Sequence, residues 1–204
     1  MLNRIFQHSS KWIVFLGVFF IFSNCGGTKS VQYFTIDMPS PVSSSTSEKT
    51  TDYLGIKQLD SGIMFHEDRL IYQDSQREIK YWNYKKWIAP PSVLLTEALK
   101  RNLSRAQIFH NVLDYPTSIQ TRYVLEGKLN SFEEHDAIEG WTVRVGFELR
   151  LFDMELHKFI WEQSFENQAA VTEKTIAGVV QGFDNASSDC IQAAVEQISK
   201  LFDK

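Results

Sequence analysis

The chain has 204 residues, 43% of them hydrophobic, with 21 basic and 25 acidic side chains and a formal net charge of −4 at pH 7. This length and composition fit one ordinary globular domain with a core of its own. Because nucleic-acid binding needs clustered Lys and Arg side chains, the acidic balance argues against DNA or RNA as a partner.

The first 24 residues have the composition of a secretory signal peptide. Residues 1–11 carry two positive charges, Arg4 and Lys11, and no acidic residue, and residues 12–22 are an unbroken apolar run. A membrane-spanning helix needs about 20 apolar residues, whereas this run has the length of a signal-peptide core. We expect residues 1–24 to be removed, which takes the net charge of the remaining chain from −4 to −6.

Cys25 stands directly after this leader and before Gly26 and Gly27. The position resembles a bacterial lipobox, where the cysteine thiol receives a diacylglyceryl group and the freed amine a fatty acid such as palmitate. Each buried methylene contributes about 0.8 kcal/mol, so two or three chains make a durable anchor. We predict lipid attachment at Cys25 and no cofactor; the alternative is an ordinary signal peptide followed by a free or paired cysteine. Gly26 favours the outer membrane over the inner one.

Residues 25–52 lie between this anchor and the main domain, which we place at residues 53–204. Gln32–Asp37 has the β-branched and aromatic content of a short strand. Met38–Asp52 is rich in Ser, Thr and Pro and cannot bury enough apolar area to order itself. It is predicted to be a flexible loop.

The first half of the main domain reads as strands followed by a helix. Short apolar and aromatic runs predict strands at Tyr53–Leu59, Leu70–Tyr72 and Ile79–Trp82. Pro90 and Pro91 then suit the first turn of a helix, where their missing amide donors are tolerated, and the leucine-rich segment that follows presents one apolar face.

The second half has the clearest periodicity. Apolar residues occupy every odd position from Trp141 to Leu151, which predicts a half-buried antiparallel strand. Alternating residues predict a strand before it, from Tyr123 to Leu129, and another after it, through Phe159–Phe165. These three strands form a meander, joined by polar hairpin loops at Glu133–Gly140 and Asp153–Lys158.

A long amphipathic helix is predicted from about Thr175 to Phe202, because its apolar residues recur at three-and-four spacing. Cys190 falls on this apolar stripe and is expected to be a small buried residue. The predicted fold class is α+β: a mainly antiparallel sheet with two helices packed on one face.

An aromatic cluster at residues 81–87 is the candidate contact surface for a partner or a lipid. It consists of Tyr81, Trp82, Tyr84 and Trp87. Aromatic side chains dominate the energetics of protein interfaces. The alternative is that alternate members point into the core while the others cap its edge.

Catalytic and metal sites are not expected. The sequence has no Walker-type phosphate loop and no nucleophile elbow. The acidic run Glu133–Asp136 is interpreted as a solvated hairpin turn rather than an acid/base or metal cluster. The mature chain's histidines share no helical ligand spacing, which argues against zinc; they are His66, His110, His135 and His157.

Several short motifs in order resemble one family over nearly the whole mature chain. They are Tyr33-Phe34-Thr35-Ile36, Leu54-Gly55-Ile56, Arg69-Leu70-Ile71-Tyr72, Tyr81 to Trp87 with Pro90-Pro91, Tyr123-Val124-Leu125-Glu126-Gly127, and Trp161. With a lipidated Cys25 before them, they are similar to the ABC-type transport auxiliary lipoprotein family, which includes the lipoprotein of the paraquat-inducible MCE transport system. The Ser-rich insert at 39–51 and Asn24 before the cysteine depart from the family pattern.

The resemblance implies a non-catalytic subunit, anchored to the outer membrane with its domain in the periplasm. Its implied partners are an inner-membrane ABC permease, its ATPase and an MCE-domain protein, which together move lipids or other hydrophobic molecules. Homo-oligomerisation is left open. The alternative function is a surface-exposed lipoprotein in adhesion or host interaction, and a lipid-anchored hydrolase is a more distant third because no nucleophile–base pair can be named.

Overall fold

The computed structural model describes residues 29–37 and 50–203, and residues 31–204 form one compact unit. The predicted signal peptide, Cys25 and most of the predicted Ser-rich loop lie outside the described residues. The elements run in this order: β1 (Gln32–Phe34), β2 (Tyr53–Ile56), β3 (Asp60–Ser61), the short 3-10 helix η3 (Ile63–Phe65), β4 (Arg69–Asp74), β5 (Ile79–Trp87), α2 (Pro91–Arg105), β6 (Asn111–Asp114), β7 (Tyr123–Asp136), β8 (Trp141–Asp153), β9 (Lys158–Ala170) and α3 (Ile176–Leu201).

Strand β7 is the centre of the sheet. Along one edge it pairs antiparallel with β8, and β8 pairs antiparallel with β9, which confirms the predicted meander. The other edge of β7 is shared in turn by β2, β3 and β4, all parallel to it. Strand β6 lies beyond β2, and β5 and then β1 lie beyond β4.

The sheet is therefore mixed, and the expectation of a mainly antiparallel sheet is wrong. Parallel neighbours need a crossover connection, and the long segment that contains α2 supplies one between β2 and β6. Side-chain periodicity reports which face of a strand is buried but not the direction of its neighbour. Strands β3 and β6 were not predicted, and β2 ends at Ile56 rather than at Leu59. Strands β4, β5, β7 and β9 extend beyond their predicted ends.

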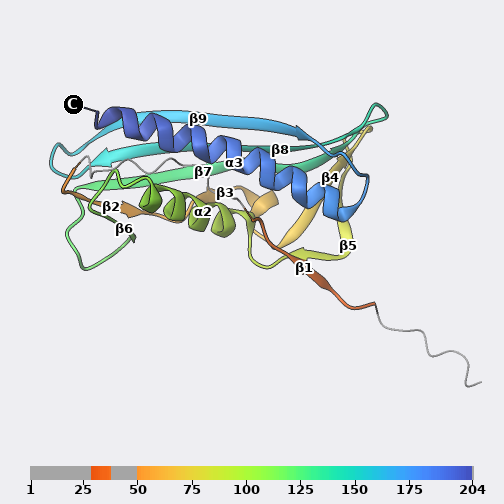
Figure 1. Cartoon of the computed structure of the whole chain (residues 1–204). Coiled ribbons are helices and arrows are strands. Elements are labelled where there is room, and N and C mark those ends of the chain that lie inside the picture. The colour runs from red at the N-terminus through yellow and green to blue at the C-terminus, as the bar shows by residue number, and fades with distance from the viewer. Residues whose placement is uncertain (1–28, 38–49, 204) are drawn as a thin grey trace, which may run out of the picture. The chain divides into compact units, whose positions relative to one another are not determined.

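The core lies between the sheet and the two helices, which occupy the same side of the sheet in Figure 1. Five inward-facing residues in the middle of β8 are at most 1% exposed: Val143, Val145, Phe147, Leu149 and Leu151. This confirms the period-two pattern. Where α3 crosses β5 and β7, Phe183 stacks on Phe132 at 4.4 Å between ring centroids and meets Trp87 edge-on at 5.2 Å.

Helix α3 has the limits that its sequence predicts. The Thr175 hydroxyl caps its start by accepting a hydrogen bond of 3.2 Å from the Gly178 amide, and Phe202 follows its last residue. Cys190 is 3% exposed on its inner face, as expected of a small core residue. Within the part of the chain that the structure describes, neither α2 nor α3 is long and apolar enough to cross a membrane.

Candidate functional site

Strand β5 divides the predicted aromatic cluster between the core and the surface. Trp87 is 1% exposed and packs on Phe132 at 5.4 Å between ring centroids, so it is a core residue. Tyr81 and Tyr84 are 45% and 52% exposed. Only these two of the four predicted residues lie open enough for substantial contact with a partner or a lipid.

Trp82 is half-buried and makes both aromatic and polar contacts. Its ring meets Trp141 edge-on at 6.2 Å and Tyr72 at 6.0 Å between centroids. Its indole Nε1 donates a hydrogen bond of 2.7 Å to Oε2 of Glu134, which is fully buried. Trp82 therefore joins β5 to the end of the central strand β7.

The acidic run Glu133–Asp136 is not a solvated turn. It forms the end of β7, where Glu133 is 5% exposed and Glu134 is 0% exposed. The interpretation as a hairpin loop was wrong because a bulge between Leu129 and Ser131 shifts the register of β7 against β8. After the bulge the inward-facing positions change from odd to even numbers, which turns Glu134 toward the core beside Phe132.

Glu134 and Asp136 form a buried carboxyl pair. Among the described residues, Glu134 Oε1 and Asp136 Oδ1 are buried without a donor, and a single proton shared by the two groups satisfies both. Burial, together with the Asp136 charge, raises the pKa of Glu134 to about 8 despite the hydrogen bond from Trp82. At neutral pH Glu134 is therefore mainly protonated.

On the opposite face of β7, the Glu133 carboxylate lies in a dense hydrogen-bond network. Its Oε1 accepts hydrogen bonds of 2.9 and 2.6 Å from Arg144 Nε and Nη2, and lies 3.3 Å from His135 Nε2. Its Oε2 accepts a 2.7 Å bond from the Phe132 amide. Because its partners all lie on β7 and β8, this network stabilises the end of the β7–β8 hairpin.

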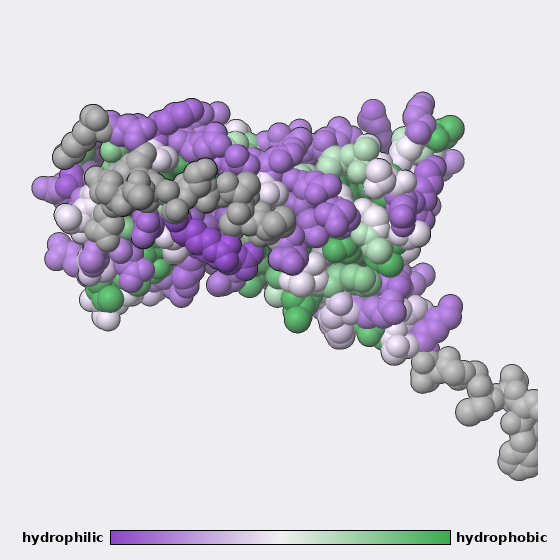
Figure 2. Space-filling model, viewed as in Figure 1, coloured by the Kyte–Doolittle hydropathy of each residue, from purple (hydrophilic) through white to green (hydrophobic). Residues whose placement is uncertain are grey.

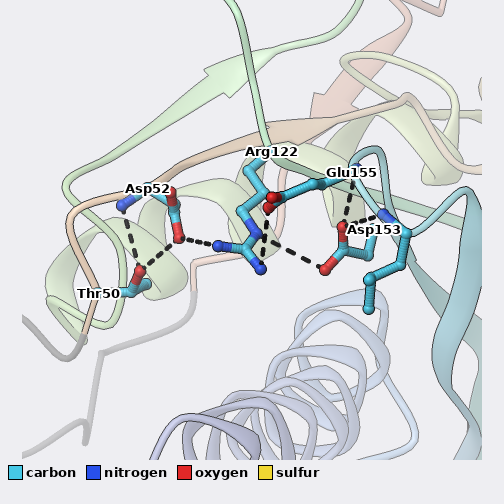
Figure 3. Close-up of polar contacts among 6 residues, drawn as sticks. Thr50, Asp52, Arg122, Asp153 and Glu155 are labelled. Carbon is cyan, nitrogen blue, oxygen red and sulfur yellow. Dashed lines mark hydrogen bonds and ion pairs between the residues drawn. The ribbon is translucent and has the colours of Figure 1, made fainter.

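A second polar site lies at the other end of β7, where Arg122 meets three carboxylates (Figure 3). Its nitrogens lie 3.5 Å from Asp52, 3.6 Å from Asp153 and 3.2 Å from Glu155. Asp153 also accepts hydrogen bonds from the backbone amides of Glu155 and Leu156, which closes the β8–β9 turn.

The Arg122 cleft has a volume of about 450 Å³. Its guanidinium is already surrounded by acidic groups, so the site has no spare positive charge to hold an anion. Asp52 comes directly before β2, Asp153 is the last residue of β8, and Glu155 follows it. The arrangement clamps these segments together and is a structural feature of the fold.

Metal-binding geometry is absent from the part of the chain that the structure describes: no group of three or more His, Cys, Asp or Glu side chains could hold an ion there. The histidines are dispersed over separate elements, and Cys190 is packed against the Val145 carbonyl at 3.6 Å. Burial raises the pKa of the Cys190 thiol to about 12, which leaves it unreactive at neutral pH.

The fold is similar to that of several solved structures. The crystal structure of a DUF330 protein from Xanthomonas campestris has a TM-score of 0.71 with 14% identity, covering 85% of this chain and 97% of that one. An uncharacterized protein has a TM-score of 0.64 with 15% identity, covering 83% and 99%. A hypothetical protein from Chlamydia trachomatis has a TM-score of 0.52 with 7% identity, covering 75% and 98%. At these identities the likeness concerns the fold alone.

No curated protein matches the chain. A family model for the ABC-type transport auxiliary lipoprotein component matches residues 34–198, from the end of β1 to the last turn of α3. The match covers nearly all of the compact unit and confirms the resemblance drawn from the short motifs. The chain belongs to the ABC-type transport auxiliary lipoprotein component family.

Proposed function

We propose that this protein is a non-catalytic, lipid-anchored subunit of an ABC/MCE-type transport system that moves lipids or other hydrophobic molecules across the cell envelope. The observation that carries the proposal is the family match over residues 34–198. The match covers α2, most of α3 and all of the sheet except the first two residues of β1, so it describes the domain as a whole.

The polar chemistry of the domain supports a non-catalytic role. Glu134 is held by Trp82 and Asp136, Glu133 by Arg144, and the acidic groups of the cleft by Arg122. A general acid or base must reach a substrate, whereas these groups are occupied within the fold. ATP hydrolysis then belongs to a partner ATPase, and passage through the inner membrane to a partner permease.

The proposed location is the periplasmic side of the outer membrane, with acylated Cys25 as the anchor. Gly26 after the cysteine supports export from the inner membrane. With its anchor in the outer membrane and its partners at the inner membrane, the domain would lie at one end of the transport route between the two membranes. The partner that bridges this distance is proposed to be an MCE-domain protein.

A genetic test follows from this assignment. Strains lacking this chain, lacking the ATPase of the neighbouring transport genes, or lacking both are compared for uptake of a hydrophobic dye. If all work in one pathway, the double deletion is no more permeable than the more permeable single one. Wild-type chain restores the barrier and Cys25→Ser does not. Additive defects, or full rescue by Cys25→Ser, would contradict the proposal.

A further inference from the structure

The strands nearest the N-terminal tether carry an exposed face rich in tyrosine. Strand β1 pairs parallel with β5 so that Tyr33 lies beside Lys86, and Lys86 in turn lies beside Arg69 of β4. Directly paired residues point to the same side of a sheet. The Arg69 guanidinium sits 4.8 Å from the ring centroid of Tyr81, which brings Tyr81 into the same group.

The opposite side of β1 and β5 faces inward. Phe34 lies beside the buried Trp87 and packs on the core. The residues next to these two, Tyr33 and Ile88, therefore point outward. The exposed apolar and aromatic residues around this surface, called here the tyrosine face, are 42–66% exposed: Val31, Tyr33, Tyr81, Tyr84 and Ile88.

The tyrosine face belongs to the corner of the domain from which the chain leads back to Cys25. Figure 1 shows β1 extending toward that end, away from the C-terminus, and Figure 2 shows apolar residues gathered over the β1 and β5 corner of a mainly hydrophilic side. The segment after β1 is held to the domain, since the Asp37 amide donates a 2.8 Å hydrogen bond to Asp184 of α3. The corner is thus a fixed part of the domain.

Chain length limits how far this corner can move from an anchor at Cys25. Gln32 stands seven positions after Cys25, and a fully extended chain spans at most about 3.6 Å per residue, which gives a reach of about 25 Å. Helix α3 alone has 26 residues and a length of about 39 Å. The tether therefore keeps β1 close to the bilayer but does not require the far end of α3 to approach it.

We propose that the tyrosine face rests on the phospholipid bilayer that holds the Cys25 anchor, with its rings at the depth of the headgroups. The proposal rests on the lipid anchor of the proposed function. Tyrosine suits this depth because its ring is apolar and its hydroxyl remains hydrated. Lys86 and Arg69 lie among these rings and can extend their charged ends toward lipid phosphates.

The contact is expected to depend mainly on apolar and aromatic groups. Lys86 is paired with Asp68 at 3.0 Å and Arg69 with Glu67 at 2.6 Å. These ion pairs offset much of the local positive charge, so raising the salt concentration should weaken the contact only slightly. Contact on this side would leave α2, α3 and the Arg122 end of the sheet facing away from the anchoring surface, open to partner proteins.

The test uses the full acylated protein with a single labelled cysteine. Acylation blocks the Cys25 thiol and burial protects Cys190, so a cysteine introduced at Tyr33 reacts selectively with a polarity-sensitive fluorophore. Tyr33→Cys is compared with Ile88→Cys on the same face and with Leu156→Cys. Leu156 is a matched exposed control, 54% exposed in the β8–β9 turn near the C-terminal end of α3.

Each variant is reconstituted in vesicles of phosphatidylethanolamine and phosphatidylglycerol with a headgroup-depth spin-labelled lipid as quencher. The proposal predicts a blue shift and loss of most fluorescence for the probes at 33 and 88, and neither change at 156. Equal, solvent-like signals at all three positions in an anchored protein would overturn it. So would protection at 33 and 88 that appears only when a partner protein is added.

Failure of the anchor gives a different result. Mass spectrometry that finds Cys25 unacylated would overturn this proposal together with the anchoring part of the proposed function. An acylated, vesicle-bound protein with unquenched probes would overturn only the membrane-facing surface and leave the transport role standing.

Discussion

Replacing Glu134 with glutamine should remove a pH dependence of folding stability. Glu134 is fully buried, and its pKa is raised to about 8 from an ordinary value of 4.5, chiefly by burial. Below pH 4.5 both the folded and the unfolded chain hold this proton. Between pH 4.5 and 8 only the folded chain holds it, so the stability contributed by the protonated group is lost as the pH rises through this window.

The size of the effect follows from the linkage of one proton. Each pH unit within the window changes the free energy of unfolding by up to about 1.4 kcal/mol. Glutamine keeps an acceptor for the Trp82 indole and offers its amide to Asp136 without titrating. The stability of Glu134→Gln relative to wild type should therefore rise by roughly 1 kcal/mol per unit between pH 5 and 8.

Urea unfolding of both proteins at pH 5, 6, 7 and 8 measures this difference, and groups common to both cancel. Asp136→Asn is a useful companion, because removing the neighbouring negative charge should lower the pKa of Glu134 and reduce the slope without abolishing it. A difference between Glu134→Gln and wild type that is the same at every pH would refute the shared-proton account.

Further predictions concern packing, charge and thiol chemistry. A methyl group at Gly127 would overlap a β8 carbonyl oxygen, so Gly127→Ala should lower the free energy of unfolding by about 3 kcal/mol. Gly140 has open space around it, so the control Gly140→Ala should change the free energy of unfolding by less than about 0.5 kcal/mol. Arg144→Ala removes the partner of the nearly fully buried Glu133 carboxylate and should lower the free energy of unfolding by about 2 kcal/mol, after allowance for the partly exposed guanidinium. Arg150→Ala removes the partner of the more exposed Glu126 and should lower it by about 0.5 kcal/mol in the same chemical-denaturation assay. Cys190 should not react with a thiol reagent in the folded acylated protein and should react after unfolding in urea; rapid labelling of the folded protein would contradict its burial.

The sequence was most informative where one face of an element is uniformly apolar. The alternating apolar residues from Trp141 to Leu151 and the apolar stripe along α3 are the side chains that become buried, and both elements form as predicted. The direction of a neighbouring strand cannot be predicted in this way, because parallel and antiparallel neighbours bury the same side chains. The mixed sheet therefore emerges only when the connections and pairings are known.

The polar features were missed for a related reason. A bulge near Ser131 changes which positions of β7 face inward, so Glu134 and Asp136 look like turn residues in the sequence although Glu134 is fully buried and Asp136 half-buried. Phe132, Glu134 and Asp136 stand two residues apart, as residues on one face of a strand do. This pattern is recognisable only once the bulge is known to have shifted the inward-facing positions of β7 from odd to even numbers. Tyr33 was assigned to a strand, yet its exposure depends on β1 being an edge strand.

The most direct test of the account is a crosslinking pull-down of the native protein from membranes, with bound proteins identified by mass spectrometry and Cys25→Ser as the unanchored control. The account predicts recovery of an MCE-domain protein together with its permease and ATPase, and strong depletion of all three with Cys25→Ser. Recovery of none of them, combined with protease accessibility of the domain on intact cells, would contradict it and favour a surface-exposed role in adhesion.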